Sequence, residues 1–407
     1  MEDRALFAEL AEARCTALLV VASSSSDPDL APFVASARLG ECFLVGSQQT
    51  GIHLGFLSAM EREEAALTEL PTLDPEALRV LRSEEVAASR GEFWNRVLSR
   101  AFEVIGLQPG RIAVAGHGAN GPLHGALSGL ESLGWEVVSG DQMLLRLRRF
   151  KSSSELEEIR RVAGATCEAF RLVAKILGGS KPKGRELWHQ GAPLRIATLR
   201  SAVAVHFAKV GLEQPERNLI APAEEGAVPH NAGTDDRILR TEESLIVDLF
   251  PRGRLFADCT RTFCVGEAPT RIVAAHEAVQ AALAQARREA QPGARGWDLQ
   301  QGVCKAFAAR GHATPLEVPG TTSGYVHGLG HGVGFEVHEY PHFRRRAGSE
   351  GRLAAGDVIA LEPGLYYPEE GFAIRLEDLV YLSDDGPETL TPLPYDLDPL
   401  AWAAVGV

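Results

Sequence analysis

The chain has 407 residues, of which 45% are hydrophobic and 23% are charged. This length suits two domains, and the composition is typical of a soluble globular protein. The formal net charge of −13 would repel a phosphate backbone unless a local basic stripe offset it. The densest basic runs, at 146–151 and 344–346, are short and are best explained as a solvated loop or a domain junction. We therefore predict that nucleic acid is not a partner.

The six cysteines are widely spaced and form no CxxC pair, which predicts free, mostly buried thiols in a reducing compartment. The acidic start of the chain lacks a signal-peptide pattern. The longest apolar runs, such as residues 17–22, are too short to span a bilayer. We therefore expect a cytoplasmic protein without a membrane partner.

The first third of the chain alternates β-rich runs with helical ones. Three apolar runs predict buried strands, at residues 17–21, 42–45 and 111–115. Residues 93–105 have the pattern of an amphipathic helix, and strands alternating with helices indicate an α/β domain over residues 1–147. His117 and His124 lie in a Gly-rich loop without a cluster of carboxylates, so we interpret them as structural or exposed histidines.

A second domain is expected over residues 148–407, after a polar stretch that suits a domain joint. Ser154 and Glu157 form a capping-box pattern, and apolar residues then follow at helical spacing. Another helix is predicted over Thr270–Glu289.

A β-hairpin is predicted where two strand patterns, 244–250 and 255–265, flank a Pro-Arg-Gly turn. If the turn centres on Gly253, Asp248 and Asp258 lie directly opposite each other, with Cβ atoms about 5 Å apart. Two carboxylates at that distance repel each other unless a cation or a proton lies between them. Each aspartate alone also has an ordinary explanation, as a residue that caps a turn.

His327, His331 and His338 lie in one segment with four alternating glycines, at 328, 330, 332 and 334. The glycines argue against a helix, and therefore against a helical HExxH zinc site, and favour a backbone bent closely around something. A neutral imidazole is a common metal ligand and carries protons near neutral pH. A structural Gly-rich loop with surface histidines is the alternative.

Two further carboxylates belong to apolar strands. Glu362 follows the run 358–361 just before a Pro-Gly turn, and Glu377 shares one face of the alternating stretch 372–380 with Arg375. Taken alone, Glu362 is explained as a solvated strand end and Glu377 as the partner of Arg375 in an ion pair.

Together these residues make an oxygen-rich ligand set for Mn²⁺, Co²⁺, Fe²⁺ or Zn²⁺: Asp248, Asp258, His331, Glu362 and Glu377. Four carboxylates are more than one ion usually needs, and two ions roughly 3.5–4 Å apart would use them all.

The ordered motifs resemble those of the M24 metallopeptidases, and more narrowly those of the aminopeptidase P and prolidase branch. They are Asp258-Cys-Thr-Arg-Thr-Phe, His327-Gly-Leu-Gly-His331, Val-His338-Glu, Glu362-Pro-Gly-Leu-Tyr and Ile-Arg375-Leu-Glu377-Asp. The resemblance implies an α/β (α+β) fold with a C-terminal pita-bread catalytic domain, residues 148–407. A smaller creatinase-like N-terminal domain, residues 1–147, would precede it.

The resemblance also implies a role for each matching residue. Asp248 would chelate one metal, Asp258 and Glu377 would bridge both, and His331 and Glu362 would complete the second. His230, His327 and His338 match histidines that face the substrate, Arg375 matches an arginine beside the bridging glutamate, and Thr260 matches a hydroxyl that supports the first ion.

Two departures from the family pattern lie in the hairpin. The aspartates are one position closer together than usual, and Phe250 stands where a glycine is common. A missing bulge would compensate for this change in register.

The implied reaction is hydrolysis of the peptide bond before proline, with the help of two divalent ions. Mn²⁺ is the preferred candidate, and Co²⁺, Zn²⁺ or Fe²⁺ are the alternatives. Glu362 would pass a proton to the leaving nitrogen, and His338 or His327 would donate to the oxyanion. The substrate would be a proline-containing peptide or dipeptide. The full N-terminal domain favours an aminopeptidase over a dipeptidase, and the family implies a homodimer.

Two other functions stay open. A pita-bread enzyme can act on a small non-peptide amide or related metabolite, because a fold does not fix a function. A non-catalytic relative can serve as a binding module or chaperone, but such relatives typically lose metal ligands, and all five are present here.

Overall fold

The computed structural model describes residues 3–34, 37–345 and 351–404. The chain divides into two compact units, Met1–Arg148 and Arg149–Val407, and each is described by itself. Both units mix helices with sheets, in agreement with the predicted α/β class.

The first unit is built on one mixed sheet with the strand order β4-β3-β2-β1-β5-β6. Its strands are β1 (Ala17–Ala22), β2 (Cys42–Ser47), β3 (Gly51–Phe56), β4 (Thr72–Leu73), β5 (Arg111–Ala115) and β6 (Glu136–Ser139). The strand β1 runs antiparallel to β2 and parallel to β5. All six residues of β1 are buried, because helices cover both faces of the sheet. The three predicted strands of this domain are therefore confirmed.

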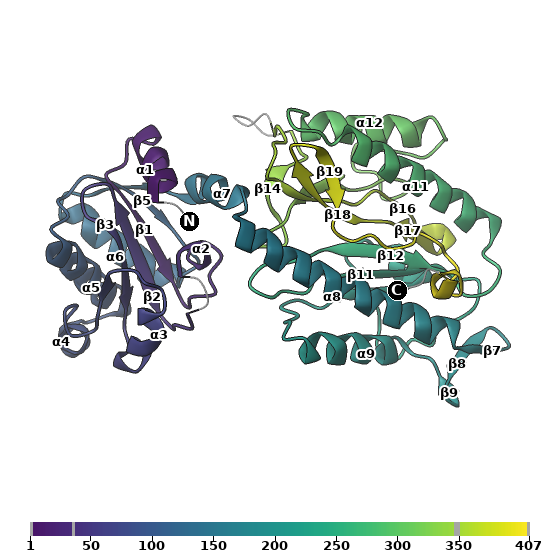
Figure 1. Ribbon diagram of the computed structural model, residues 1–407, viewed down its shortest axis with the longest axis horizontal. Coiled ribbons are helices and arrows are strands. Elements are labelled where there is room, and N and C mark those ends of the chain that lie inside the picture. The colour runs from purple at the N-terminus through teal and green to yellow at the C-terminus, as the bar shows by residue number, and fades with distance from the viewer. Residues whose placement is uncertain (1–2, 35–36, 346–350, 405–407) are drawn as a thin grey trace. The chain divides into compact units, whose positions relative to one another are not determined.

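The helices of the first unit divide between the two faces of this sheet (Figure 1). One face packs against α1 (Asp3–Glu12), α2 (Ala31–Val34) and α7 (Asp141–Arg149), and the other against α4 (Val80–Val86), α5 (Arg90–Ile105) and α6 (Asn120–Ser132). The short helices η1 (Ala59–Glu61) and α3 (Arg62–Ala66) lie between β3 and β4 in the chain. The predicted amphipathic helix is thus α5, which begins three residues earlier than expected.

The second unit begins with α8 (Ser153–Gly178), whose N-terminus carries a capping box. The residues of the box are Ser152 and Glu155, so the prediction of Ser154 and Glu157 was two residues late. Ser152 accepts a hydrogen bond from the Glu155 amide, and the Glu155 carboxylate accepts one from the Ser152 amide. The serine run 152–154 offers the same pattern twice, and the sequence alone does not distinguish them.

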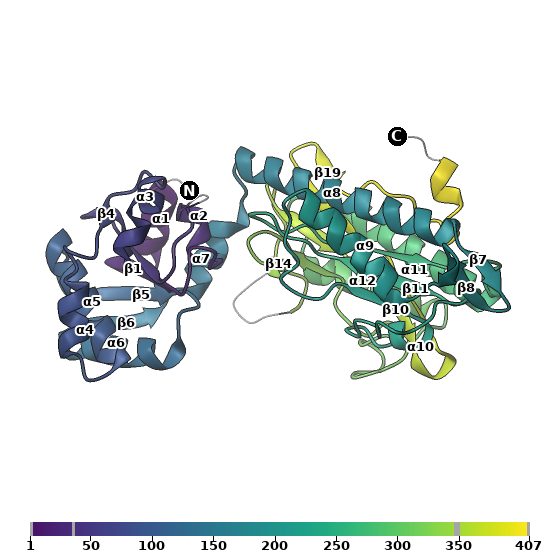
Figure 2. The same ribbon diagram turned by 90° about the horizontal axis from the view of Figure 1, so that it is seen from below.

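The other helices of this unit are α9 (Ile196–Lys209), α10 (Ala223–Gly226), α11 (Thr270–Glu289), α12 (Gly296–Ala308), η2 (Pro368–Glu370) and η3 (Ala401–Ala404). The predicted helix over Thr270–Glu289 is confirmed residue for residue by α11. Apolar residues of α11 and α12 pack into one core with those of the C-terminal strands, and α8 packs against α9. Sheets therefore lie between two pairs of helices (Figures 1 and 2).

The described residues of this unit form four sheets. A three-stranded sheet contains β10 (Leu219–Pro222), β11 (Leu245–Leu249) and β12 (Cys259–Phe263). A five-stranded sheet has the order β14 (Glu339–His342), β13 (Gly330–Gly332), β15 (Val358–Leu361), β18 (Asp378–Ser383) and β19 (Gly386–Thr389). The two smaller sheets pair β16 (Gly364–Tyr367) with β17 (Phe372–Arg375), and β7 (Lys181–Lys183), β8 (Glu186–His189) and β9 (Ala192–Pro193) with one another.

Two predicted strand patterns differ from the structure. The hairpin turn centres on Arg254, since Asp248 pairs with Thr260 and Arg252 with Phe256, so Asp248 is not directly opposite Asp258. The alternating stretch 372–380 is not one strand but β17 and β18, which belong to different sheets. Glu377 lies at the break between them.

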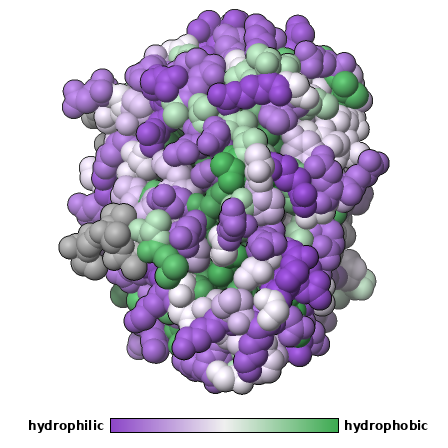
Figure 3. All heavy atoms as spheres, turned by 90° about the vertical axis from the view of Figure 1, so that its right-hand side faces the viewer, coloured by the Kyte–Doolittle hydropathy of each residue, from purple (hydrophilic) through white to green (hydrophobic). Residues whose placement is uncertain are grey.

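The described cysteines are free, and all but Cys15 are buried, as predicted. Among the described helices, none is both long and apolar enough to cross a membrane. On the side of the molecule shown in Figure 3, hydrophilic residues dominate and hydrophobic residues gather in a narrow central strip. Exposed apolar side chains of this limited kind are normal for globular proteins.

The glycines between the histidines are required where backbones approach closely. A Cβ atom on Gly330 would lie 2.0 Å from the Ala360 carbonyl oxygen, and one on Gly332 would lie 2.1 Å from that of Tyr340. A Cβ atom on Gly328 would meet nothing closer than 3.9 Å. The bent backbone predicted here is thus a strand, β13, enclosed by β14 and β15.

We predict that Gly330→Ala lowers the free energy of unfolding by about 1–3 kcal/mol, because the methyl group forces β13 away from β15. Gly328→Ala is the matched control and should change it by less than about 0.5 kcal/mol. Chemical denaturation of both variants tests this. Equal stabilities would show that the strand accommodates the methyl group.

Candidate metal centre

The five predicted ligands come from separate elements and line one cavity of about 660 Å³. Asp248 is in β11, His331 is in β13, Asp258 precedes β12, Glu362 follows β15, and Glu377 lies between β17 and β18. The ligand atoms of Asp258, His331 and Glu377 lie within 4.8 Å of one another. Three sheets thus bring together residues that are up to 129 positions apart in the sequence, as Asp248 and Glu377 are.

Asp248 and Asp258 line the same cavity despite the corrected register of the hairpin. The turn is centred one residue later than predicted, which moves the position opposite Asp248 by two residues, from Asp258 to Thr260. A shift of two residues keeps the same face of a strand, whereas a shift of one would reverse it. Phe250, the departure from the family pattern, also lines this cavity.

His331 presents one nitrogen to the carboxylates. Its Nδ1 lies 3.1 Å from the Gly332 carbonyl oxygen, which can only accept, so Nδ1 carries the proton. The lone pair of Nε2 then faces Asp258 Oδ2 at 3.8 Å and Glu362 Oε1 at 3.7 Å. Burial, with a contribution from His338, lowers the pKa of His331 to about 3. The ring is therefore neutral near pH 7, as a metal ligand must be.

Arg375 pairs with Asp248 and not with Glu377. Its guanidinium donates to Asp248 Oδ2 at 2.7 Å, and also to Thr260 Oγ1 at 3.3 Å and to the Tyr366 hydroxyl at 2.9 Å. The alternative explanation of Glu377, as the ion-pair partner of Arg375, is therefore not what the structure shows. Glu377 Oε2 instead accepts a hydrogen bond from Thr260 Oγ1 at 2.8 Å.

The donor set fits divalent metal ions. Asp248 Oδ1 and Asp258 Oδ1 are buried, and no hydrogen-bond donor among the described residues reaches either atom. Burial, together with Glu377, Asp248 and Glu362, raises the pKa of Asp258 well above its usual value. Burial and neighbouring carboxylates also raise the pKa of Glu377 well above its usual value. Such a cluster is stable at neutral pH when protons or cations neutralise it.

The hydrogen bonds of His327 differ from those expected of a substrate donor. Its Nδ1 donates to the Gly328 carbonyl oxygen at 2.7 Å, and its Nε2 accepts from the Tyr366 hydroxyl at 3.0 Å. Both nitrogens are thus engaged within the protein. His230 and His338 also line the cavity, and the His338 ring packs against that of His331 with centroids 4.2 Å apart.

Two residues in or next to this cavity had no functional role predicted from the sequence. Tyr366, which bridges His327 and Arg375, lies in the Glu-Pro-Gly-Leu-Tyr motif, but the motif alone gave its hydroxyl no role. Arg344 is exposed and lies outside the helices and strands, as predicted, but it also lines the cavity. The other basic run, 146–151, spans the boundary between the two units, as the predicted domain junction requires, and its Lys151 forms a buried ion pair with Glu339 at 2.5 Å.

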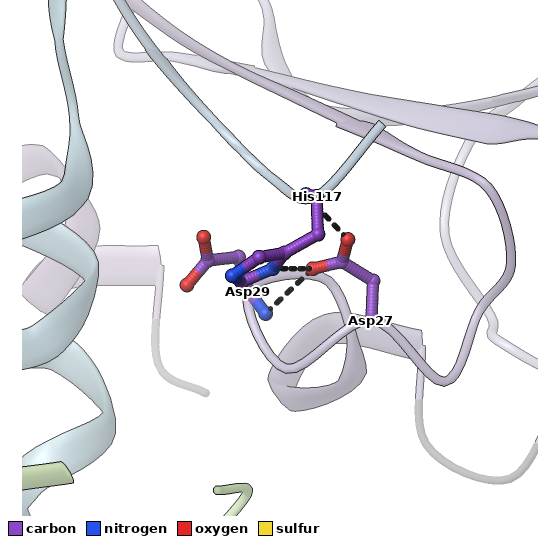
Figure 4. A group of neighbouring side chains, drawn as sticks. All are labelled: Asp27, Asp29 and His117. Carbon is purple, nitrogen blue, oxygen red and sulfur yellow. Dashed lines mark hydrogen bonds and ion pairs between the residues drawn. The ribbon is translucent and has the colours of Figure 1, made fainter. Parts of the chain in front are cut away.

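A second group of carboxylates surrounds His117 in the first unit, contrary to our prediction (Figure 4). Asp27 accepts hydrogen bonds from the amides of Asp29 and His117, and Asp29 accepts one from the amide of Gly116. These carboxylates therefore hold the segments after β1 and β5 together, which is a structural role. The other histidine of the predicted loop, His124, is exposed in helix α6.

Comparison with known proteins identifies the family. Residues 157–384, more than half of the chain, match the model of metallopeptidase family M24. The chain belongs to this family. This M24 metallopeptidase is 24% identical over 392 residues to a protein named probable dipeptidase PepE from Mycobacterium tuberculosis, covering 95% of this chain and 96% of the relative. It is 32% identical over 192 residues to an Xaa-Pro dipeptidase from Pyrococcus furiosus, covering 46% of this chain and 51% of the relative.

The fold of the enzyme matches that of solved relatives. The crystal structure of the prolidase from Pyrococcus horikoshii superposes with a TM-score of 0.75 at 21% identity, covering 97% of this chain and 99% of the prolidase. The predicted pita-bread fold and the predicted aminopeptidase P and prolidase branch are confirmed. Membership of the family implies divalent metal ions and a peptide substrate.

We predict that Glu362 makes the stability of the metal-free enzyme depend on pH. Burial raises the pKa of Glu362 from 4.5 to about 7. A carboxyl with a raised folded-state pKa contributes stability that is present below the unfolded value and is lost as the pH rises through the folded value. The Tm of Glu362→Gln in EDTA should therefore fall less than that of the wild type between pH 4.5 and pH 7.

The matched control is Glu388→Gln, since Glu388 is exposed and pairs with Arg160 outside the cavity. Its Tm should follow that of the wild type across the same range. Parallel curves for all three proteins would contradict the assignment of the raised pKa.

Proposed function

We propose that this enzyme hydrolyses the peptide bond before proline, using two divalent ions held by Asp248, Asp258, His331, Glu362 and Glu377. The observation that supports this proposal is that these five residues line one cavity. Two buried carboxylate oxygens in it have no hydrogen-bond donor among the described residues. Mn²⁺ is the first candidate, because hard oxygen ligands outnumber nitrogen ligands four to one by residue.

The protein residues would divide the chemistry as follows. When bound, the ions lower the pKa of a water molecule and polarise the carbonyl group to be attacked. Glu362 lies beside His331 and passes a proton to the proline nitrogen as it leaves. His338 donates to the oxyanion, because neither nitrogen of His327 is free to do so. His327 instead orients Tyr366, and through it Arg375.

The lining of the cavity suits a small zwitterionic peptide. Phe250, Val337 and Phe343 offer apolar surface for a proline ring. Arg344 adds an exposed guanidinium to the lining, close enough to Glu362 to act against the rise of its pKa. A free carboxylate on proline would pair with it. This guanidinium and the names of the relatives favour a dipeptidase, although the sequence had favoured an aminopeptidase.

We predict different losses for two histidines. His331→Ala should lose bound metal, whereas His338→Ala should keep it and lose most of kcat, because it removes a contact made mainly in the transition state. Metal analysis of the wild type should find close to two ions per chain, and EDTA should abolish hydrolysis. Equal metal loss in the two variants would reject this division of roles.

We predict that the enzyme cleaves Ala-Pro faster than Ala-Pro-Ala, and Ala-Ala-Ala least. Arg344→Met should raise KM for Ala-Pro about tenfold, through the loss of one charge-assisted contact worth about 1.5 kcal/mol, and should change kcat little. Arg345→Met is the control, because Arg345 is exposed and does not line the cavity.

Steady-state kinetics with Mn²⁺ and with Co²⁺ measure these values. Faster cleavage of Ala-Pro-Ala would make the enzyme an aminopeptidase. Cleavage of none of the three peptides would favour a small-amide substrate. A homodimer remains a prediction from the family resemblance, and light scattering at several concentrations tests it.

A further inference from the structure

Glu377 is held from β12 at its amide, its carbonyl and one carboxylate oxygen. Its amide donates to the Thr260 carbonyl oxygen at 3.0 Å, and its Oε2 accepts from Thr260 Oγ1 at 2.8 Å. Its carbonyl oxygen accepts from Arg261 at 2.6 Å and from the Cys259 thiol at 3.4 Å. Oε1 and the second lone pair of Oε2 are left to reach metal ions.

Arg261 is the centre of this arrangement. Its side chain is 1% exposed, and besides the Glu377 carbonyl it donates to Asp378 Oδ1 at 2.8 Å. It also donates to the carbonyl oxygens of Thr260 at 2.9 Å and Pro394 at 2.9 Å. A planar guanidinium with five N–H groups can serve these acceptors at once, whereas a lysine cannot.

Asp378 fixes the other side of the same peptide. Its carboxylate is fully buried and accepts from Arg261, from Arg287 at 3.3 Å and from the Tyr395 hydroxyl at 2.5 Å. The chain passes from β17 to β18 between these anchors, and Glu377 projects from the break. Neither Arg261 nor Asp378 lines the cavity.

We propose that Arg261 and Asp378 are positioning residues that aim the Glu377 carboxylate at the metals. This inference rests on the proposed role of Glu377 as a bridging ligand. A bridging carboxylate must keep both oxygens at fixed distances from two ions, so a small rotation of its backbone weakens both sites. Residues that orient the ligands of a metal typically change its affinity 10–100-fold when they are altered.

The enzyme contains a matched control pair. Arg149 and Asp357 also form an ion pair with a fully buried carboxylate in the same unit, at 2.6 and 2.7 Å. This pair does not contact Glu377. Asp357 lies just before β15, whereas Glu362 lies just after the other end of that strand. A purely structural role for Arg261 predicts that both pairs respond alike to substitution.

The test compares Arg261→Lys and Asp378→Asn with Arg149→Lys and Asp357→Asn. Calorimetric titration of the metal-free proteins with Mn²⁺ gives affinities, denaturation gives stabilities, and kinetics on Ala-Pro gives kcat and KM. The first two variants should bind Mn²⁺ about 10–100-fold more weakly. At saturating metal, their kcat should fall by a larger factor than their KM changes. The control variants should lose stability but keep their Mn²⁺ affinity within about threefold of the wild type, the ordinary scatter of such contributions.

Unchanged Mn²⁺ affinity in a folded Arg261→Lys, alongside normal binding by the wild type, would overturn this inference alone. Equal loss of affinity in the control variants would overturn it as well, since the effect would then follow from general destabilisation. Failure of the wild type to bind Mn²⁺ would overturn the proposed function together with this inference.

Discussion

The mutual repulsion of buried carboxylates is the constraint on which the second unit depends. Asp248, Asp258, Glu362 and Glu377 line one cavity, and burial raises the pKa of each. Arg375 offsets part of this charge through its contact with Asp248. In the proposed enzyme, metal ions neutralise the rest. The protein must hold the carboxylates in place before the ions bind, so the surrounding backbone has to be rigid.

That rigidity comes from backbone contacts between the sheets. Gly330 lies against the Ala360 carbonyl, which fixes β13, and with it His331, against β15. The bridge between Thr260 and Glu377 joins the three-stranded sheet to the start of β18. These contacts leave little freedom to the proposed ligands, and α11 and α12 bury the opposite side of the strands in one apolar core. Preorganisation of this kind lowers the cost of assembling a charged site.

The five proposed ligands could be singled out from the sequence because each is a charged or imidazole group at a place where an apolar strand pattern predicts burial. Their hydrogen-bond partners were less predictable, because they depend on pairing between distant strands. The period-2 alternation predicted that Arg375 pairs with Glu377, but in the structure Arg375 pairs with Asp248, 127 residues away in the sequence. The same limit applies to His117, whose neighbour Asp27 is 90 residues distant. The predicted centre of the hairpin turn was wrong by one residue, which shifts the strand pairing by two residues. The predicted face of Asp248 was still correct, because side chains two residues apart lie on the same face of a strand.

The three histidines of one glycine-rich segment show how neighbouring backbone decides between roles that the sequence leaves equal. His327 and His331 both donate from Nδ1 to the carbonyl oxygen of the next residue, so both direct Nε2 away from the segment. For His331, Nε2 faces two carboxylates, whereas for His327 it meets the Tyr366 hydroxyl. The Nε2 lone pair of His331, which faces carboxylates, suits a cation. The Nε2 lone pair of His327 already accepts a hydrogen bond from the hydroxyl. The hydrogen-bond donor to the oxyanion in the proposed reaction is then His338, whose ring packs against His331 at the cavity.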